Sequence, residues 1–278
     1  MSVSDQLMVL VDPVARRHDG ESVRIAKDVL SAGATLKVCL PDSPEEFARA
    51  LARRGSRRPV VVGDDHALLR AVTLLHRDRE LATTVLALVP VGGEVSLAKS
   101  LGVPTGAVAA ARAVLDGAGR RLDLLVDDSD GVVLGGLRIP CGAPAGVAGG
   151  GAPGWVRSCR ALVRKVRGAG AAPSVAHGGV SGPLRLRVEV DGVTLVDLDR
   201  AVETVSVAPG EGLAEVEVRP VSVGAASRML KARARTVSVS GTDFRYRSDA
   251  TSVGPVRRRT WVSHPGGWSL TLPPSLAP

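Results

Sequence analysis

Two glycine-containing turns, each between an apolar strand and a helix, constrain the fold of this chain most. The first, residues 63–66, follows a short β-branched run at Pro59–Val62, and the second, residues 90–94, follows Thr84–Val89. Runs of this kind are typical of buried parallel strands, and helical spacing of apolar residues resumes after each turn. A strand-turn-helix aims backbone N–H groups at one point and suits a phosphate. The two turns therefore predict one nucleotide site.

The first half of the chain alternates strands with helices. Apolar runs at Leu7–Val11 and Thr35–Leu40 predict strands, and the segments Ser22–Ser31 and Pro44–Arg54 have the apolar spacing of helices. Such alternation predicts an α/β N-terminal domain, residues 1–124, with a doubly wound, mostly parallel sheet. Ligands of such sheets bind at the carboxyl ends of the strands, which is where both turns lie.

The pattern changes in the second half. Residues 142–154 are rich in Gly, Ala and Pro and read as a loop, and residues 155–168 have the spacing of a basic amphipathic helix. From Leu184 onward apolar residues alternate with polar ones, and Asp191-Gly192 is a strong hairpin signal. We therefore predict a β-sandwich-like C-terminal domain, residues 125–278, that carries this loop and helix.

The motifs around the two turns resemble the catalytic domain of diacylglycerol kinases, the family of bacterial lipid kinases and sphingosine kinases, which lies near the NAD kinases. The family has Gly-Gly-Asp-Gly-Thr in the first turn, then Pro-x-Gly-Thr-Gly-Asn-Asp and a helix that closes in Leu-Gly-x-Pro. The likeness extends over nearly the whole chain. The matching residues are Gly63, Asp65, Leu68, Arg70 and Val72 in the first pattern and Pro90, Gly92, Ala98, Leu101, Gly102 and Pro104 in the second.

The resemblance implies phosphoryl transfer from ATP, with Mg²⁺, to the hydroxyl of a diacylglycerol-like lipid. Asp65 would accept the hydroxyl proton or organise the metal, and Asp249 stands where the family has Asp-Gly-Glu in its second domain. Each has a structural alternative, a helix N-cap for Asp65 and a turn residue for Asp249. His66 has the alternative of an exposed turn histidine. The positions implied to bind nucleotide are Asp12, Gly63, Asp64, His66, Gly92, Gly93 and Glu94.

The residues at the functional positions of the two motifs differ from the family pattern more than the glycine and apolar positions around them do. Asp64, His66 and Ala67 replace Gly, Gly and Thr, and residues 93–96 replace Thr-Gly-Asn-Asp. Carboxylates at Asp64 and Glu94 would repel a triphosphate unless a cation such as Mg²⁺ bridged them to phosphate oxygens. The Glu of Asp-Gly-Glu is also absent, which removes a proposed general base. These departures favour a protein that no longer catalyses.

The composition of the chain limits the classes of molecule that we expect it to bind. The net charge of +8 suits an anionic membrane surface or a lipid substrate, with a solvated arginine-rich surface as the alternative. Only 2% of the residues are aromatic and no recognition motif accompanies the charge, so we expect no nucleic acid partner. Three widely spaced cysteines and the lack of an apolar run of about 18 residues favour a cytoplasmic protein, peripheral to membranes if it binds them.

Three hypotheses follow from the sequence. The chain is an ATP-dependent lipid kinase, a catalytically inactive pseudokinase that binds or regulates, or an adaptor for anionic surfaces with no relation to nucleotide. The resemblance favours the first and the substituted motif positions favour the second. The identity of any metal ligands, the lipid and the oligomeric state stay open.

Overall fold

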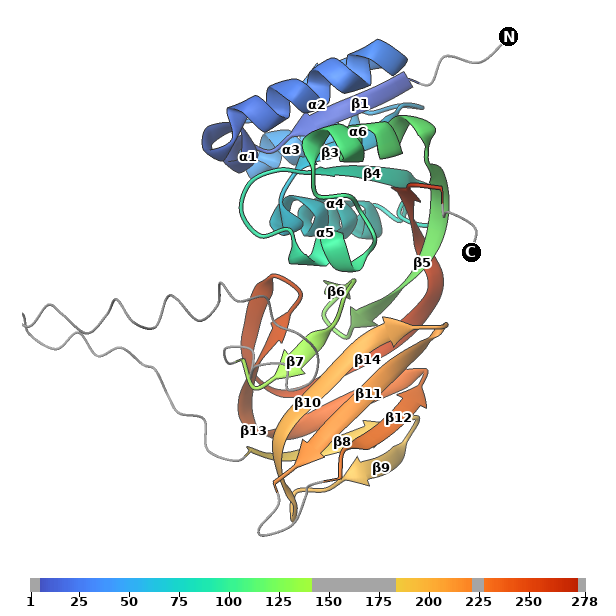
Figure 1. Cartoon of the computed structure of the whole chain (residues 1–278). Helices are drawn as coiled ribbons and strands as arrows, with labels where there is room; N and C mark the ends of the chain where they lie inside the picture. Colours follow the sequence, from blue (N-terminus) through green and yellow to red (C-terminus); the bar gives the residue numbers. More distant parts are fainter. Residues whose placement is uncertain (1–5, 142–183, 222–227, 275–278) are drawn as a thin grey trace, which may run out of the picture. The chain divides into compact units, whose positions relative to one another are not determined.

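A parallel sheet forms the first part of the fold (Figure 1). This computed structural model describes residues 6–141, 184–221 and 228–274. Strands pair in parallel in the order β2-β1-β3-β4. Their bounds lie within one residue or so of the predicted runs: β1 (Gln6–Val11), β2 (Thr35–Cys39), β3 (Arg58–Gly63) and β4 (Val85–Pro90).

Helices pack against this sheet in two groups. Alternate residues of the strands enter two cores: Leu10, Val61 and Leu88 pack with the helices α3, α4 and α5, whereas Leu7, Val9 and Val62 pack with α1, α2 and α6. This division follows from the pleat, because successive side chains of a strand point to opposite faces. The helices are α1 (Pro13–His18), α2 (Gly20–Gly33), α3 (Pro44–Ala52), α4 (Asp65–Arg77), α5 (Ser96–Ser100) and α6 (Ala107–Asp116).

The second part is built of antiparallel strands, as their alternating pattern predicted. They pair in the order β12-β11-β10-β7-β13-β14, and β8 pairs with β9, β10 and β13. Asp191 and Gly192 join β8 to β9 with φ of 48° and 81°, the positive values that a two-residue hairpin turn requires. The strands are β5 (Ala118–Asp127), β6 (Val132–Val133), β7 (Leu137–Ile139), β8 (Leu184–Val190), β9 (Val193–Val196), β10 (Ala201–Gly210), β11 (Leu213–Pro220), β12 (Leu230–Ala234), β13 (Thr236–Ser248) and β14 (Thr251–Leu272).

A third core fills the antiparallel part. It contains Phe244, Tyr246 and Trp261, and the rings of Tyr246 and Trp261 meet edge to face with their centroids 5.3 Å apart. Aromatic pairs of this geometry stabilise beyond their buried area. Because the chain holds so few aromatic residues, most of this core is valine and leucine.

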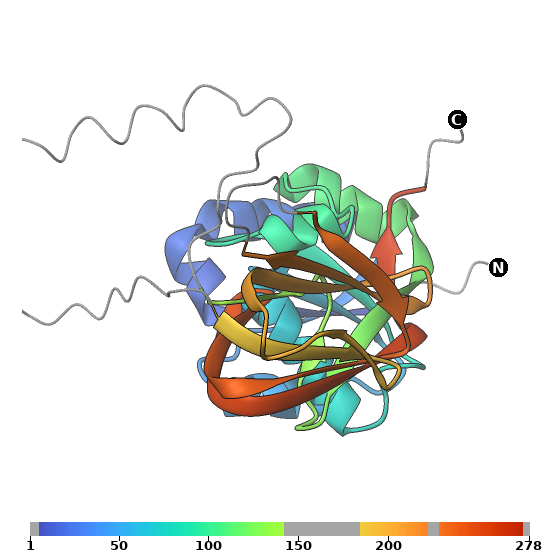
Figure 2. The same ribbon diagram turned by 90° about the horizontal axis from the view of Figure 1, so that it is seen from below.

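Strand β14 connects the two parts (Figures 1 and 2). Its first half, from Thr251 to Val262, pairs with β13, and its second half, from Trp261 to Leu272, pairs with β5. Ser269 and Leu270 also pair in parallel with β4. The predicted boundary between residues 124 and 125 falls inside β5. The division into a doubly wound domain and a sandwich-like domain stays a prediction, and the predicted loop 142–154 and helix 155–168 lie outside the described residues.

Candidate functional site

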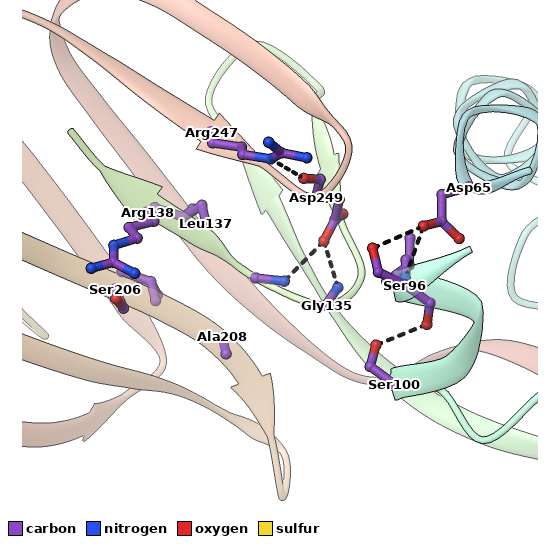
Figure 3. A pocket seen from close by; sticks show the side chains of 13 residues that line it. Asp65, Ser96, Ser100, Gly135, Leu137, Arg138, Ser206, Ala208, Arg247 and Asp249 are labelled. Atoms are coloured by element: carbon purple, nitrogen blue, oxygen red, sulfur yellow. Dashed lines mark hydrogen bonds between the residues drawn. The ribbon is translucent and has the colours of Figure 1, made fainter. Parts of the chain in front are cut away.

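A pocket of about 380 Å³ brings together residues from both parts of the fold (Figure 3). Both carboxylates that the sequence predicted as catalytic, Asp65 and Asp249, line it. The other predicted site residues do not. The remaining lining residues are Ser96, Leu97, Ser100, Gly135, Gly136, Leu137, Arg138, Ser206, Val207, Ala208 and Arg247.

Asp65 is fully buried and caps a helix other than its own. Its Oδ2 accepts from the backbone N–H of Leu97 at 2.8 Å and from Ser96 Oγ at 3.3 Å, and its Oδ1 accepts from the N–H of Ala98 at 3.0 Å. These N–H groups open α5, whose own N-cap residue, Val95, offers no side-chain acceptor. The carboxylate of Asp65 therefore satisfies the first turn of α5.

The N-cap of α4 is Asp64, so the alternative prediction of Asp65 as the cap of its own helix is wrong. Asp64 Oδ1 accepts from the N–H of Ala67 at 3.1 Å. The backbone at Asp64 has a φ of −88°, which any residue adopts, so its replacement of a family glycine causes no strain here. Gly63 is needed for space, since a Cβ there would lie 2.6 Å from that of Ala67. The side chain of His66 is exposed and makes no hydrogen bond to any described residue.

The two glycine turns lie against each other, as predicted for a single site. The N–H of Asp65 donates to the carbonyl of Glu94 at 2.9 Å, and Gly93 lies close to the carboxylate of Asp64. Gly92 has a φ of 106°, and a Cβ there would approach Ala15 of α1 at 3.5 Å. Gly92 is therefore required by its backbone conformation.

Asp12 lies next to Gly63, and the negative charge of its carboxylate is neutralised within the protein. It is 2% exposed, its Oδ1 accepts from the N–H of Val14 at 2.8 Å, and its Oδ2 accepts from Arg70 Nη1 at 2.7 Å. Arg70 also lies over the ring of Phe47, 5.6 Å from its centroid. Asp12, which the resemblance implied to bind nucleotide, thus has its negative charge paired with Arg70 and not directed at a ligand.

Asp249 binds a backbone loop. Its carboxylate accepts from the N–H groups of Leu134, Gly135 and Gly136 at 2.8, 2.8 and 2.9 Å. Figure 3 shows this carboxylate bonded to the loop. Burial raises the pKa of the Asp249 carboxyl above its ordinary value, the three amides act in the opposite direction, and the nearby Asp65 carboxylate adds to the rise. With a φ of 46°, Asp249 is also a turn residue, as its structural alternative predicted.

Glu94 is paired with an arginine from β13. Arg247 Nη2 lies 3.1 Å from Glu94 Oε2, and Arg247 Nε donates to the carbonyl of Asp249 at 3.1 Å. The contact joins the second glycine turn to the turn after β13. Sequence reasoning missed Arg247, Arg138 and Ser206. The one feature of the sequence that could have marked these residues is that each stands at an outward position of an alternating strand.

The residues that would hold Mg²⁺-ATP do not fit that role in this arrangement. Asp64 caps α4, Asp65 caps α5 and Glu94 is paired with Arg247. Within residues 6–141, 184–221 and 228–274, no group of three or more His, Cys, Asp or Glu side chains is placed to hold a metal ion. The carboxylates are satisfied by donors of the protein itself.

No helix in the described part of the chain is long and apolar enough to cross a membrane.

Comparison with known proteins gives a match in structure alone. No known family profile and no curated protein matches the sequence. A diacylglycerol kinase structure from Bacillus anthracis strain Sterne matches with a TM-score of 0.70 and 13% identity over 100% of both chains. Two further structures under that name, from the same strain, have TM-scores of 0.69 and 0.68 at 13% and 12% identity, again over 100% of each chain. The chain thus has the fold of these diacylglycerol kinases, which confirms the resemblance at the level of fold.

Proposed function

We propose that this chain is a lipid-kinase-like protein that has lost phosphoryl transfer and uses the pocket of Figure 3 to bind a ligand. One observation carries the proposal: Asp65, the residue implied to accept a proton or hold the metal, is fully buried with both carboxylate oxygens bonded to the N–H groups of α5. A general base must reach the proton that it abstracts. A carboxylate held in this way is a structural acceptor.

The backbone around the pocket supports the same conclusion. Phosphates are commonly held by free backbone N–H groups at turns and helix starts. Here Asp65 occupies the N–H groups of Leu97 and Ala98, and Asp249 occupies those of residues 134–136. The chain's own carboxylates thus stand where a triphosphate would need donors, and they add negative charge.

The competing function is that of an active lipid kinase, which the shared fold over the whole chain favours. The two functions differ in phosphoryl transfer. We expect the purified chain to transfer no phosphate from Mg²⁺-ATP to dioctanoylglycerol, and we expect no rise in melting temperature with millimolar Mg²⁺-ATP, because a ligand that binds the folded state must raise its stability. A diacylglycerol kinase of demonstrated activity, assayed in parallel, is the positive control.

Transfer that follows the protein through purification and is lost in Asp65→Asn would overturn the proposal. Transfer that follows the protein through purification but persists in Asp65→Asn would overturn it as well, and would show that Asp65 is not the base. Transfer that separates from the protein during purification would identify a contaminating kinase. The predicted partners, an anionic membrane surface or a lipid, and the predicted cytoplasmic location stay part of this proposal. Binding of vesicles and soluble phosphate esters tests the predicted partners.

A further inference from the structure

We propose that Arg138, Ser206 and Arg247 form a site for a phosphate ester at one end of the pocket. The proposal deepens the proposed function and rests on it in one respect, that the pocket binds a ligand. All three residues line the pocket, and Figure 3 shows Arg138 and Arg247 on neighbouring strands, with Ser206 beside Arg138.

The register of the strands places the three side chains together. Arg138 of β7 is the cross-strand partner of Ser206 on β10 and of Arg247 on β13. Direct partners across a sheet project to the same face. Leu137 and Ile139, the neighbours of Arg138 along β7, are buried in the core on the opposite face. The two arginines and the serine are thus directed away from that core.

This placement leaves the charge of Arg138 without a partner among the described residues. Like charges directly opposite each other on a sheet destabilise it. Arg247 has Glu94 as a partner, but the half-buried side chain of Arg138 makes no hydrogen bond or ion pair with any residue in the described ranges. The nearby carboxylates of Asp65 and Asp249 accept from backbone N–H groups instead. An anionic ligand would relieve the repulsion.

The donors suit a phosphate group. A guanidinium presents several N–H donors in a planar fork that matches phosphate oxygens, and a serine hydroxyl adds a donor from another direction. The space of about 380 Å³ has room for a small esterified group beyond the phosphate. At the other end of the pocket, the hydroxyls of Ser96 and Ser100 are exposed to it. A free phosphate and a lipid headgroup share this chemistry.

The test is a titration of the full chain at one fixed salt concentration of about 0.15 M, at which the Debye length is about 8 Å. The probes are inorganic phosphate, sn-glycerol 3-phosphate, and vesicles of phosphatidylcholine with and without phosphatidic acid. We expect saturable binding of sn-glycerol 3-phosphate, weakened about tenfold or more in Arg138→Gln, since a hydrogen bond to a charged group is lost. Ser206→Ala should weaken it by a smaller factor. Arg138 has no partner to lose in the described structure, so the variant should fold.

The matched control is Arg53→Gln. Arg53 is exposed, and its side chain makes no hydrogen bond or ion pair with any described residue. It lies before the amino end of β3, whereas the pocket residue Asp65 follows the carboxyl end of that strand. The variant loses the same charge as Arg138→Gln, and its affinity should stay within about twofold of the unmodified chain, because exposed charges far from a ligand are largely screened. Equal weakening in Arg138→Gln and Arg53→Gln would overturn the site, and so would no binding of any probe.

The probes separate the two sources of phosphate and keep the two proposals apart. Arg138-dependent binding to phosphatidic acid vesicles that exceeds binding of sn-glycerol 3-phosphate supports a lipid headgroup, whereas binding of the soluble probes alone supports a free phosphate ester. Phosphoryl transfer from ATP would overturn the loss of catalysis but leave an Arg138-dependent phosphate site standing. Absence of both transfer and probe binding would overturn the phosphate site alone.

Discussion

Two aspartates of the pocket act as acceptors for backbone segments distant in sequence. Asp65 bonds the start of α5, about 30 residues further on, and Asp249 bonds the loop before β7, more than 110 residues earlier. Charge-assisted hydrogen bonds of this kind are stronger than those between neutral groups. The residues that the resemblance marks as catalytic thus contribute to stability in this chain.

The first prediction concerns Asp65→Asn. The amide keeps one acceptor oxygen but replaces the other with an N–H₂ group, which faces a backbone donor of α5. We expect a loss of about 1.5–3 kcal/mol in the free energy of unfolding, the range for hydrogen bonds to charged groups. Urea denaturation followed by circular dichroism measures it.

Asp64→Asn is the matched control, because Asn and Asp are about equally good N-caps. Its stability should change by a few tenths of a kcal/mol at most. Equal losses in the two variants would show that Asp65 is no more than an ordinary cap, and would remove the structural role that supports the proposed loss of catalysis.

At the scale of elements, the short strand β7 and the loop before it organise the pocket. β7 has three residues and pairs with both β10 and β13. Just before it, Gly136 has a φ of 150°, and a Cβ there would lie 3.1 Å from the carbonyl oxygen of Val207. Gly136 also donates to Asp249. The loop before β7 therefore depends on a backbone conformation of Gly136 that residues other than glycine rarely adopt.

Gly136→Ala is the second prediction. We expect a loss of about 1–3 kcal/mol in the free energy of unfolding, because a side chain in this backbone region is strained and crowds β10. Affinity for sn-glycerol 3-phosphate should fall with it, since Arg138 is two residues away. Urea denaturation and the titration described above measure the two effects.

Gly20→Ala provides the comparison. Gly20 opens α2, and a Cβ there would meet no atom within 4 Å. Stability should be unchanged or rise by up to about 1 kcal/mol, because alanine restricts the unfolded chain. If Gly136→Ala behaved like Gly20→Ala, the loop would not need its glycine and the argument for a fixed β7 would fail.

Local patterns predicted the elements better than the site. The strands β1 to β4 and the Asp191-Gly192 hairpin depend on apolar periodicity and turn chemistry, which act between near neighbours. The adjacency of the two glycine turns was also predicted, because parallel strands bring their carboxyl ends to one edge of a sheet. The site residues Arg138 and Ser206 could not be predicted, because their meeting depends on the register between β7 and β10, which are far apart in the sequence.

At the scale of the whole molecule, β5 and β14 run beside each other through both parts of the fold. Trp268 of β14 is fully buried in a core of the α/β part, and Trp261 of the same strand is fully buried in the antiparallel core. A single long strand thus contributes to two cores. Disruption of one core should therefore propagate to the other.

This leads to the third prediction, that the two parts unfold together. The chain has three tryptophans, Trp155, Trp261 and Trp268, so Trp155→Phe with Trp261→Phe leaves Trp268 as the reporter, and Trp155→Phe with Trp268→Phe leaves Trp261. In each double variant, the urea midpoint from fluorescence should coincide with that from circular dichroism, as for a two-state transition. Separate midpoints would instead support the predicted division into two independent domains.

The strands β1 to β4 and the two glycine turns could be located from the sequence, because they depend on side-chain spacing and backbone preferences along a few residues. The roles of the polar residues in those turns depend on contacts with distant parts of the chain. Asp65 and Asp249 accept from distant backbone N–H groups, Asp12 pairs with Arg70, and Arg138 is the cross-strand partner of Arg247. A motif specifies a side chain, but its chemistry depends on which distant groups the fold places against it.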